Sequence, residues 1–269
     1  MFKLFNTIRM KTIAENKLGR YLKYAIGEIL LVVLGILIAL QINTWNQARI
    51  EKKQEEQILI SLKKEYIDNL NQLNDKIYLR KKIIHSANQL INIIDKKEKL
   101  KNYSVDSIEI YIGTTTVFPT FNAISGVTND ILNSGKLHLI KNNDLRISLS
   151  NWSGDIDQVT EMETVLLNYY FSTYQPFLVK HIQIRNSFNA MLSASNLTEK
   201  FNLNKSIENV KSIDPSNKIL EYETLFNSED FEDYLVTILT YSRVANVQCE
   251  GFKLKITDNL NRIDKELNK

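Results

Sequence analysis

Residues that interrupt helices or carry common chemistry are scarce in this chain of 269 residues. It has one cysteine, Cys249, so an intrachain disulfide is excluded. Its eight glycines are scattered, and neither a phosphate-cradling loop nor a Gly-x-Ser-x-Gly nucleophile motif occurs. Of its three prolines the first is Pro119, and no glycine or proline lies between Gly35 and Gly113. These absences favour long helices and leave no motif that names a reaction.

Candidate catalytic and metal-binding residues are equally sparse. His85, His138 and His181 are far apart and form no ligand pair with metal-binding spacing, so each is expected to be an ordinary histidine. Cys249 is expected to be a packing residue rather than a nucleophile. Glu161 and Glu163 are two residues apart, do not share a helix face, and are expected to be solvated. We therefore expect no catalytic residue, no metal and no cofactor, and expect that the protein is not an enzyme.

A long apolar run stands out near the amino terminus. It extends from Ile29 to Leu40, and the helix from Tyr24 to Trp45 would be about 32 Å long, which matches the hydrocarbon core of a bilayer. A buried core helix and a cleaved signal peptide are the alternatives. The flanking aromatic residues, which prefer the lipid headgroups, argue against the first, and the lack of a cleavage site argues against the second. We predict an uncleaved signal anchor with a transmembrane helix over residues 25–45.

Basic residues are concentrated before this run. A single acid, Glu15, accompanies them in the leader. They are Lys3, Arg9, Lys11, Lys17, Arg20 and Lys23. The positive-inside rule places residues 1–24 in the cytoplasm, with an interfacial amphipathic helix as one form of the leader, and residues 46–269 outside it. The leader accounts for the net positive charge, so a lipid bilayer is the expected partner and nucleic acid is not.

Within the predicted span, Glu28 is the one ionisable residue. Because it lies one turn from the interface, we interpret it as a carboxylate that reaches the headgroups or is protonated; the alternative is a functional site. Gly27, Gly35 and Ala39 share a helix face, and Gly35-x-x-x-Ala39 is a spacing that permits close approach of two spans. They are candidates for transmembrane packing.

After the span, apolar residues recur at steps of three and four, which is typical of one amphipathic face in a coiled-coil-like stalk. These positions are Leu59, Leu62, Tyr66, Leu70, Leu73, Ile77, Ile84, Ala87, Ile91 and Ile94. Arg80 occupies one position at which an apolar residue is expected. The pattern predicts that the transmembrane helix continues without interruption to about Lys97.

Two further long helices are predicted. One begins at the start signal Asn142-Asn143-Asp144 and is bent or ended near Pro176, and the other follows Ser228, with four acids in its first turns. Residues 105–116 are predicted to form a short helix or strand, residues 121–133 a helix, and residues 137–140 a turn. The 41 residues 186–226 are rich in Asn, Ser and Lys and carry no firm assignment. The predicted fold is an all-α bundle of three long helices plus short ones.

A dense group of aromatic residues lies in the second predicted long helix. Trp152, Tyr169, Tyr170 and Tyr174, together with Phe171, are the best candidates in the sequence for a contact surface. The alternative is that they belong to the core, which is the usual place for aromatic residues at helical spacing.

The block Tyr24-Ala25-Ile26-Gly27-Glu28-Ile29, with Leu34-Gly35-Ile36 and Ala39-Leu40-Gln41-Ile42-Asn43, is very similar to the opening of a family of uncharacterised bacterial single-span membrane proteins. The resemblance continues more loosely in Leu132-Asn133-Ser134-Gly135-Lys136-Leu137 and weakens beyond about Tyr170. Thr44 and Gln47 depart from the family pattern. The resemblance implies a bacterial inner-membrane location and a helical domain, but no activity.

Three functions fit these observations. The first is a membrane-anchored extracytoplasmic module that binds other proteins, its own copies or envelope components as a scaffold or sensor. The second is a small-molecule sensor that signals through a separate partner, because a cytoplasmic segment of about 24 residues is too short for a signalling domain. The third is an envelope hydrolase without a recognisable motif, which would need polar residues clustered in a cleft.

Overall fold

The computed structural model describes residues 18–96, 102–194, 211–217 and 222–269. These residues form helices and include no strand, which confirms the all-α prediction. The chain divides into two compact units, Met1–Gln57 and Ile58–Lys269. The predicted interfacial helix of the leader lies largely outside the described residues.

Helix α2 (Leu18–Asp95) is 78 residues long and contains the apolar run. In the amino-terminal unit, Ile29, Leu31 and Ile38 are each at least 60% exposed, so their apolar surface is not buried against protein. Among the described residues, α2 is the one helix that is long and apolar enough to cross a membrane. The predicted end near Lys97 agrees with the observed end at Asp95.

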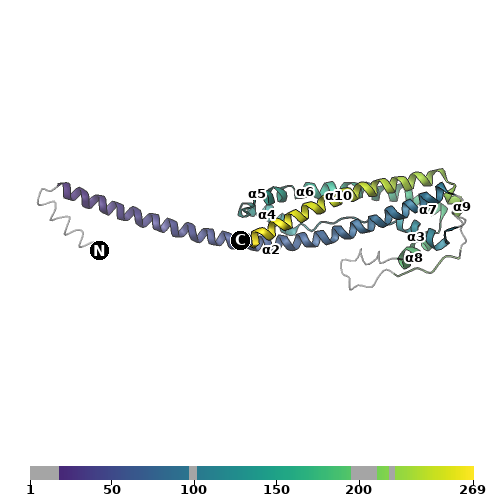
Figure 1. Cartoon of the computed structure of the whole chain (residues 1–269), viewed down its shortest axis with the longest axis horizontal. Helices are drawn as coiled ribbons and strands as arrows, with labels where there is room; N and C mark the ends of the chain where they lie inside the picture. The colour runs from purple at the N-terminus through teal and green to yellow at the C-terminus, as the bar shows by residue number, and fades with distance from the viewer. Residues whose placement is uncertain (1–17, 97–101, 195–210, 218–221) are drawn as a thin grey trace. The chain divides into compact units, whose positions relative to one another are not determined.

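The second unit is built around three helices, α2, α6 (Trp152–Tyr169) and α10 (Glu229–Leu267). Figure 1 shows α10 beside α2, and the ion pairs Lys63–Asp264 at 2.6 Å and Lys81–Glu250 at 3.6 Å fix the two helices as antiparallel. Helix α10 begins after Ser228, as predicted, with three acids in its first turn.

Two apolar clusters form the core of this unit. The Trp152 cluster contains Leu59 to Ile77 of α2, Val159 of α6 and the carboxyl-terminal half of α10. The Tyr174 cluster contains Leu79 to Ile93 of α2, Leu166 of α6 and the amino-terminal half of α10. Each of the three helices therefore contributes to both clusters, and each passes from one to the other once.

The predicted seam on α2 is correct up to Ile77 but shifts afterwards. Beyond Arg80, Ala87 is buried as predicted, but the predicted Ile84, Ile91 and Ile94 are only half-buried. The buried apolar residues beside them are Ile83, Leu90 and Ile93. Ile83 and Leu90 lie at multiples of seven residues from the buried Leu62. Ile84 and Ile91 instead continue the series of the half-buried Leu70, which the four-residue step after Tyr66 placed one position off the buried face.

The prediction of one continuous second helix is wrong. It consists of α5 (Asn143–Ser150), α6, the π-helical stretch η3 (Tyr170–Tyr174) and α7 (Gln175–His181). The first break is at Asn151, where α5 ends and α6 begins. The π-helical stretch comes directly before α7, and Pro176 lies in the first turn of α7. Proline is tolerated there because N–H groups in a first helical turn have no partner within the helix.

The remaining elements are short. Residues 105–116 are resolved as a helix, α3 (Val105–Thr115), which packs against α8 (Ile184–Ala194). The helix predicted over 121–133 is only α4 (Gly126–Asn133), and the 3-10 helix η2 (Lys136–Leu139) replaces the predicted turn. Within 186–226 the structure describes part of α8, residues 211–217 and α9 (Tyr222–Phe226).

Candidate functional site

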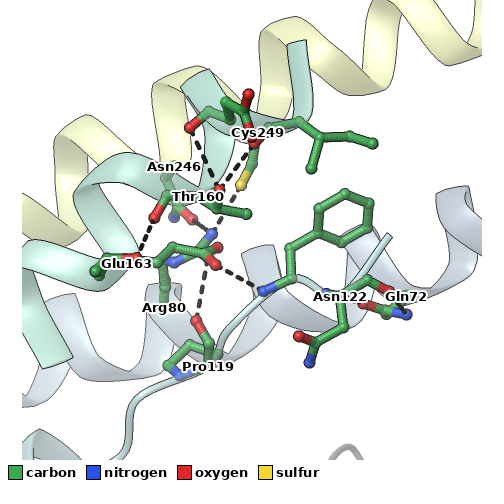
Figure 2. A network of polar contacts seen from close by, with 12 residues as sticks. Gln72, Arg80, Pro119, Asn122, Thr160, Glu163, Asn246 and Cys249 are labelled. Carbon is green, nitrogen blue, oxygen red and sulfur yellow. Dashed lines mark hydrogen bonds and ion pairs between the residues drawn. The ribbon is translucent and has the colours of Figure 1, made fainter. Parts of the chain in front are cut away.

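A buried ion pair lies where the two apolar clusters meet. Arg80 of α2 and Glu163 of α6 have side chains only 1% and 2% exposed, and Nη2 of Arg80 donates to Oε1 of Glu163 (Figure 2). Above and below them on these two helices, the neighbouring core residues are apolar. The pair thus lies between apolar residues at the junction of the two clusters.

The other contacts of Arg80 reach α10 and the residues around Pro119. Arg80 therefore joins four segments of the chain, because it also links α2 to α6. Nη2 also donates to the carbonyl oxygen of Pro119 at 3.2 Å, and Nη1 donates to Sγ of Cys249 at 2.9 Å and to Oδ1 of Asn246 at 3.4 Å (Figure 2). Oε2 of Glu163 accepts a 2.6 Å hydrogen bond from the backbone N–H of Phe121. We call Arg80, Glu163, Asn246 and Cys249 the polar layer.

The electrostatics of this layer reflect its burial. Desolvation lowers the pKa of Arg80 from its ordinary value, although the neighbouring Cys249 opposes that change. Burial raises the pKa of the Cys249 thiol, and the Arg80 guanidinium only partly offsets this effect. Cys249 is therefore a neutral hydrogen-bond acceptor in the core. Its burial agrees with the predicted packing role.

The segment 117–125, here called the strap, runs along α2 in the opposite direction, starting next to this layer, and is held by side chains of α2. Asn69 donates from Nδ2 to the carbonyl of Ile124 at 2.7 Å and accepts from its N–H at 2.8 Å. Gln72 contacts the N–H and carbonyl of Asn122 in the same way, at 2.6 and 2.9 Å. Each amide thus replaces the two backbone bonds that a neighbouring strand would make.

Glu65 extends this row of contacts to the start of α4. Its carboxylate accepts hydrogen bonds from the backbone N–H groups of Val127 and Thr128 at 2.6 and 3.1 Å, and from the Thr128 hydroxyl at 2.6 Å. A carboxylate at this end of a helix satisfies N–H groups that have no partner within the helix and complements the helix dipole. These backbone contacts explain why residues 121–125 are not helical, contrary to prediction.

The structure separates the predicted aromatic contact surface into two places. Trp152 is 1% exposed and stacks on Tyr66 with ring centroids 4.7 Å apart, whereas Tyr170 and Tyr174 are buried in the other cluster. Tyr169 is half-buried beside Tyr234. As a joint surface the prediction is wrong, because burial places Trp152, Tyr170 and Tyr174 in the core.

The other predicted residues are dispersed. Glu28, Gly27, Gly35 and Ala39 are exposed on α2, so their proposed role in packing between spans stays a prediction. His85 lies edge-on to Tyr111, His138 is hydrogen-bonded through Nδ1 to Gly135 at 2.7 Å, and His181 likewise to Phe177 at 2.8 Å. Among the described residues, no group of three His, Cys, Asp or Glu is arranged to hold a metal.

Sequence reasoning missed Glu163, which is buried rather than solvated as predicted. The signal that could have found it is Arg80, the basic residue in an otherwise apolar seam, because a buried guanidinium requires a carboxylate partner. Glu161, its neighbour two residues earlier, is exposed as predicted.

Residues 28–158 match the model of the family of unknown function DUF6090. This match confirms the resemblance to an uncharacterised family, and it ends within α6, before Glu163. Comparisons with curated proteins and with solved structures gave no match.

Proposed function

We propose that the protein is a single-span module of the bacterial inner membrane whose helical bundle lies outside the cytoplasm and binds other proteins or envelope components as a scaffold or sensor. In this proposal the protein acts by binding rather than by catalysis. The observation that carries it is α2 itself, in which one helix contains both an apolar segment with exposed side chains and one wall of a folded bundle.

The use of polar groups in the bundle supports binding over chemistry. Arg80 is hydrogen-bonded to Glu163 and Asn246, and Glu65 and Asn69 contact backbone groups of the same chain. Catalytic groups need to be within hydrogen-bond reach of a substrate. In this bundle these residues instead fix the path of the chain.

Orientation is the first part to test, by cysteine labelling of the full-length protein in cells. Asp258→Cys in α10 is exposed, and Lys11→Cys lies in the leader. An impermeant maleimide should label Asp258→Cys in spheroplasts and Lys11→Cys only after lysis. The native Cys249 is buried, so the unsubstituted protein provides the background. The reverse labelling pattern would refute the proposed topology.

Binding is the second part. Affinity purification of the full-length protein from mild detergent should recover specific envelope partners that an unrelated single-span protein does not recover. Recovery of only shared, nonspecific proteins by a folded sample would contradict the scaffold function. A specific metabolite that raises the melting temperature of the same sample would favour the small-molecule sensor instead, because a ligand stabilises the state it binds.

A further inference from the structure

The outward face of α10 carries an uncharged stripe. Its apolar members are Val236, Val244, Val247 and Leu254, which are 43%, 40%, 73% and 67% exposed. Thr240 and Gly251 are also exposed and lie between them. Single exposed apolar residues are normal on proteins, but these six positions lie on one side of the helix, opposite the side that includes Ile238, Ala245 and Ile256 of the core.

From Thr240 to Leu254 the spacing within the stripe is that of a coiled-coil seam. Val244 and Gly251 are seven residues apart, as are Val247 and Leu254, and the two series alternate by three and four residues. From Val236 to Leu254 the stripe spans 18 helical steps, about 27 Å. A second helix that packs along it would therefore bury its four exposed apolar side chains.

We propose that this stripe, Val236 to Leu254 of α10, is the contact between two copies of the chain, paired as parallel α10 helices. The proposal rests on the membrane anchoring proposed above. Copies anchored in one membrane have the same orientation, so a two-fold axis between them lies along the membrane normal, and helices that run along this axis pair as parallel. Anchoring also confines the copies, which raises the effective concentration for a short seam.

Charges beside the stripe fit this pairing. In a parallel pair, a residue that flanks one seam position meets the partner's residue five places further along. Glu250 then faces Lys255 of the second copy, which is an attractive pair, and Arg243 faces the uncharged Gln248. Within one copy Glu250 is 3.6 Å from Lys81, and Lys255 pairs with Asp155 of α6. A second copy would therefore extend an existing row of charges.

Disulfide cross-linking of the full-length protein in membranes tests the proposal. Val247→Cys and Leu254→Cys should each give an oxidised dimer, because equivalent seam residues face each other across a parallel pair. Ile147 on α5 is also an exposed apolar residue, at 53%, but lies outside the stripe. Ile147→Cys is therefore the matched control and should stay monomeric. Equal cross-linking of all three variants, or cross-linking of none, would overturn the proposal.

Direction and specificity need two more variants. Co-expressed Val236→Cys and Leu254→Cys should not form a mixed disulfide, since only an antiparallel pair would bring these positions together.

Val247→Lys with Leu254→Lys should abolish the cross-linking of a Thr240→Cys reporter and leave the melting temperature unchanged, because both side chains are outside the core. Loss of a captured envelope protein without loss of the dimer would show that the stripe binds a different partner, and would refute the pairing.

Membrane fractionation of each variant separates the two proposals. Monomeric protein in the membrane fraction contradicts the α10 pairing and leaves the anchor intact. Protein recovered from the aqueous fraction without detergent contradicts the anchor itself.

Discussion

The two apolar clusters on either side of Arg80 and Glu163 are built differently although the same three helices cross both. In the Trp152 cluster, the strap and α4 are fastened to α2 by polar side chains such as Asn69 and Glu65, and α5 is hydrogen-bonded to α10 through Asn259. In the Tyr174 cluster, short and irregular helices pack through aromatic rings, including Tyr174, Phe177 and Phe231. One cluster is thus fixed largely by directional hydrogen bonds, and the other by shape and apolar area.

The polar layer between the clusters can be disrupted by removing one partner. Glu163→Ala leaves the Arg80 charge buried without its carboxylate and should lower the free energy of unfolding by about 3–5 kcal/mol. Glu161→Ala, on the exposed face of the same helix, should change it by less than about 0.5 kcal/mol. Urea denaturation of the two variants measures both. A similarly small change in the free energy of unfolding for both variants would mean that the buried ion pair does not hold the two clusters together.

The aromatic cluster is tested at Gly113, where α3 meets α8. A Cβ at this position would lie 2.1 Å from the carbonyl oxygen of Ser187, so Gly113→Ala must displace a backbone and should cost about 1–3 kcal/mol. Gly154→Ala in α6 meets no atom within 4 Å, and should stabilise the protein by about 0.5–1 kcal/mol because alanine favours helices. Melting curves that order these variants the other way would contradict the close packing of α3 on α8.

The polar fastening of the Trp152 cluster is tested at Asn69. Asn69→Ala removes two hydrogen bonds to Ile124, each of about 0.5–1.5 kcal/mol, and should therefore cost about 1–3 kcal/mol. Amide hydrogen exchange at Ile124 should accelerate more than exchange in α8, which belongs to the other cluster. Asn71→Ala, an exposed amide two residues away, is the matched control and should leave exchange unchanged.

Tyr174 should have a small effect at neutral pH and contributes a pH dependence to the stability at alkaline pH. Burial raises the pKa of its phenol above the ordinary 10.0, so the folded state keeps a proton that the unfolded state releases. The contribution is therefore complete below pH 10 and is lost as the pH rises from 10 toward the folded pKa, by about 1.4 kcal/mol per pH unit. Tyr174→Phe should flatten this alkaline fall in stability while costing about 1 kcal/mol at neutral pH through its lost bond to Thr115.

Much of the helical framework was predictable because periodicity and start signals are local. The seam from Leu59 to Ile77 and the start of α10 after Ser228 both follow from the sequence alone. The break at Asn151 was not predictable, because α5 and α6 are both good amphipathic helices and only tertiary packing sets the change between them. Gly154 lies beyond the break, so no glycine or proline marks it.

The polar layer was only half predictable. Arg80 disturbs an apolar pattern and can be recognised within its own helix, whereas Glu163 is separated from it by 83 residues and resembles its exposed neighbour Glu161. The strap was missed for a related reason. Its non-helical path depends on Asn69 and Gln72, about fifty residues away, and not on its own propensities.

The way in which α2 holds the strap has a consequence for sequence variation in relatives. Asn69 and Gln72 bind only main-chain atoms, and the side chains of Asn122 and Ile124 are exposed. Positions 122 and 124 should therefore accept almost any amino acid without loss of this local geometry, except proline, which has no N–H to donate. Related proteins can thus change the character of this patch of surface while the path of the chain beneath it is preserved.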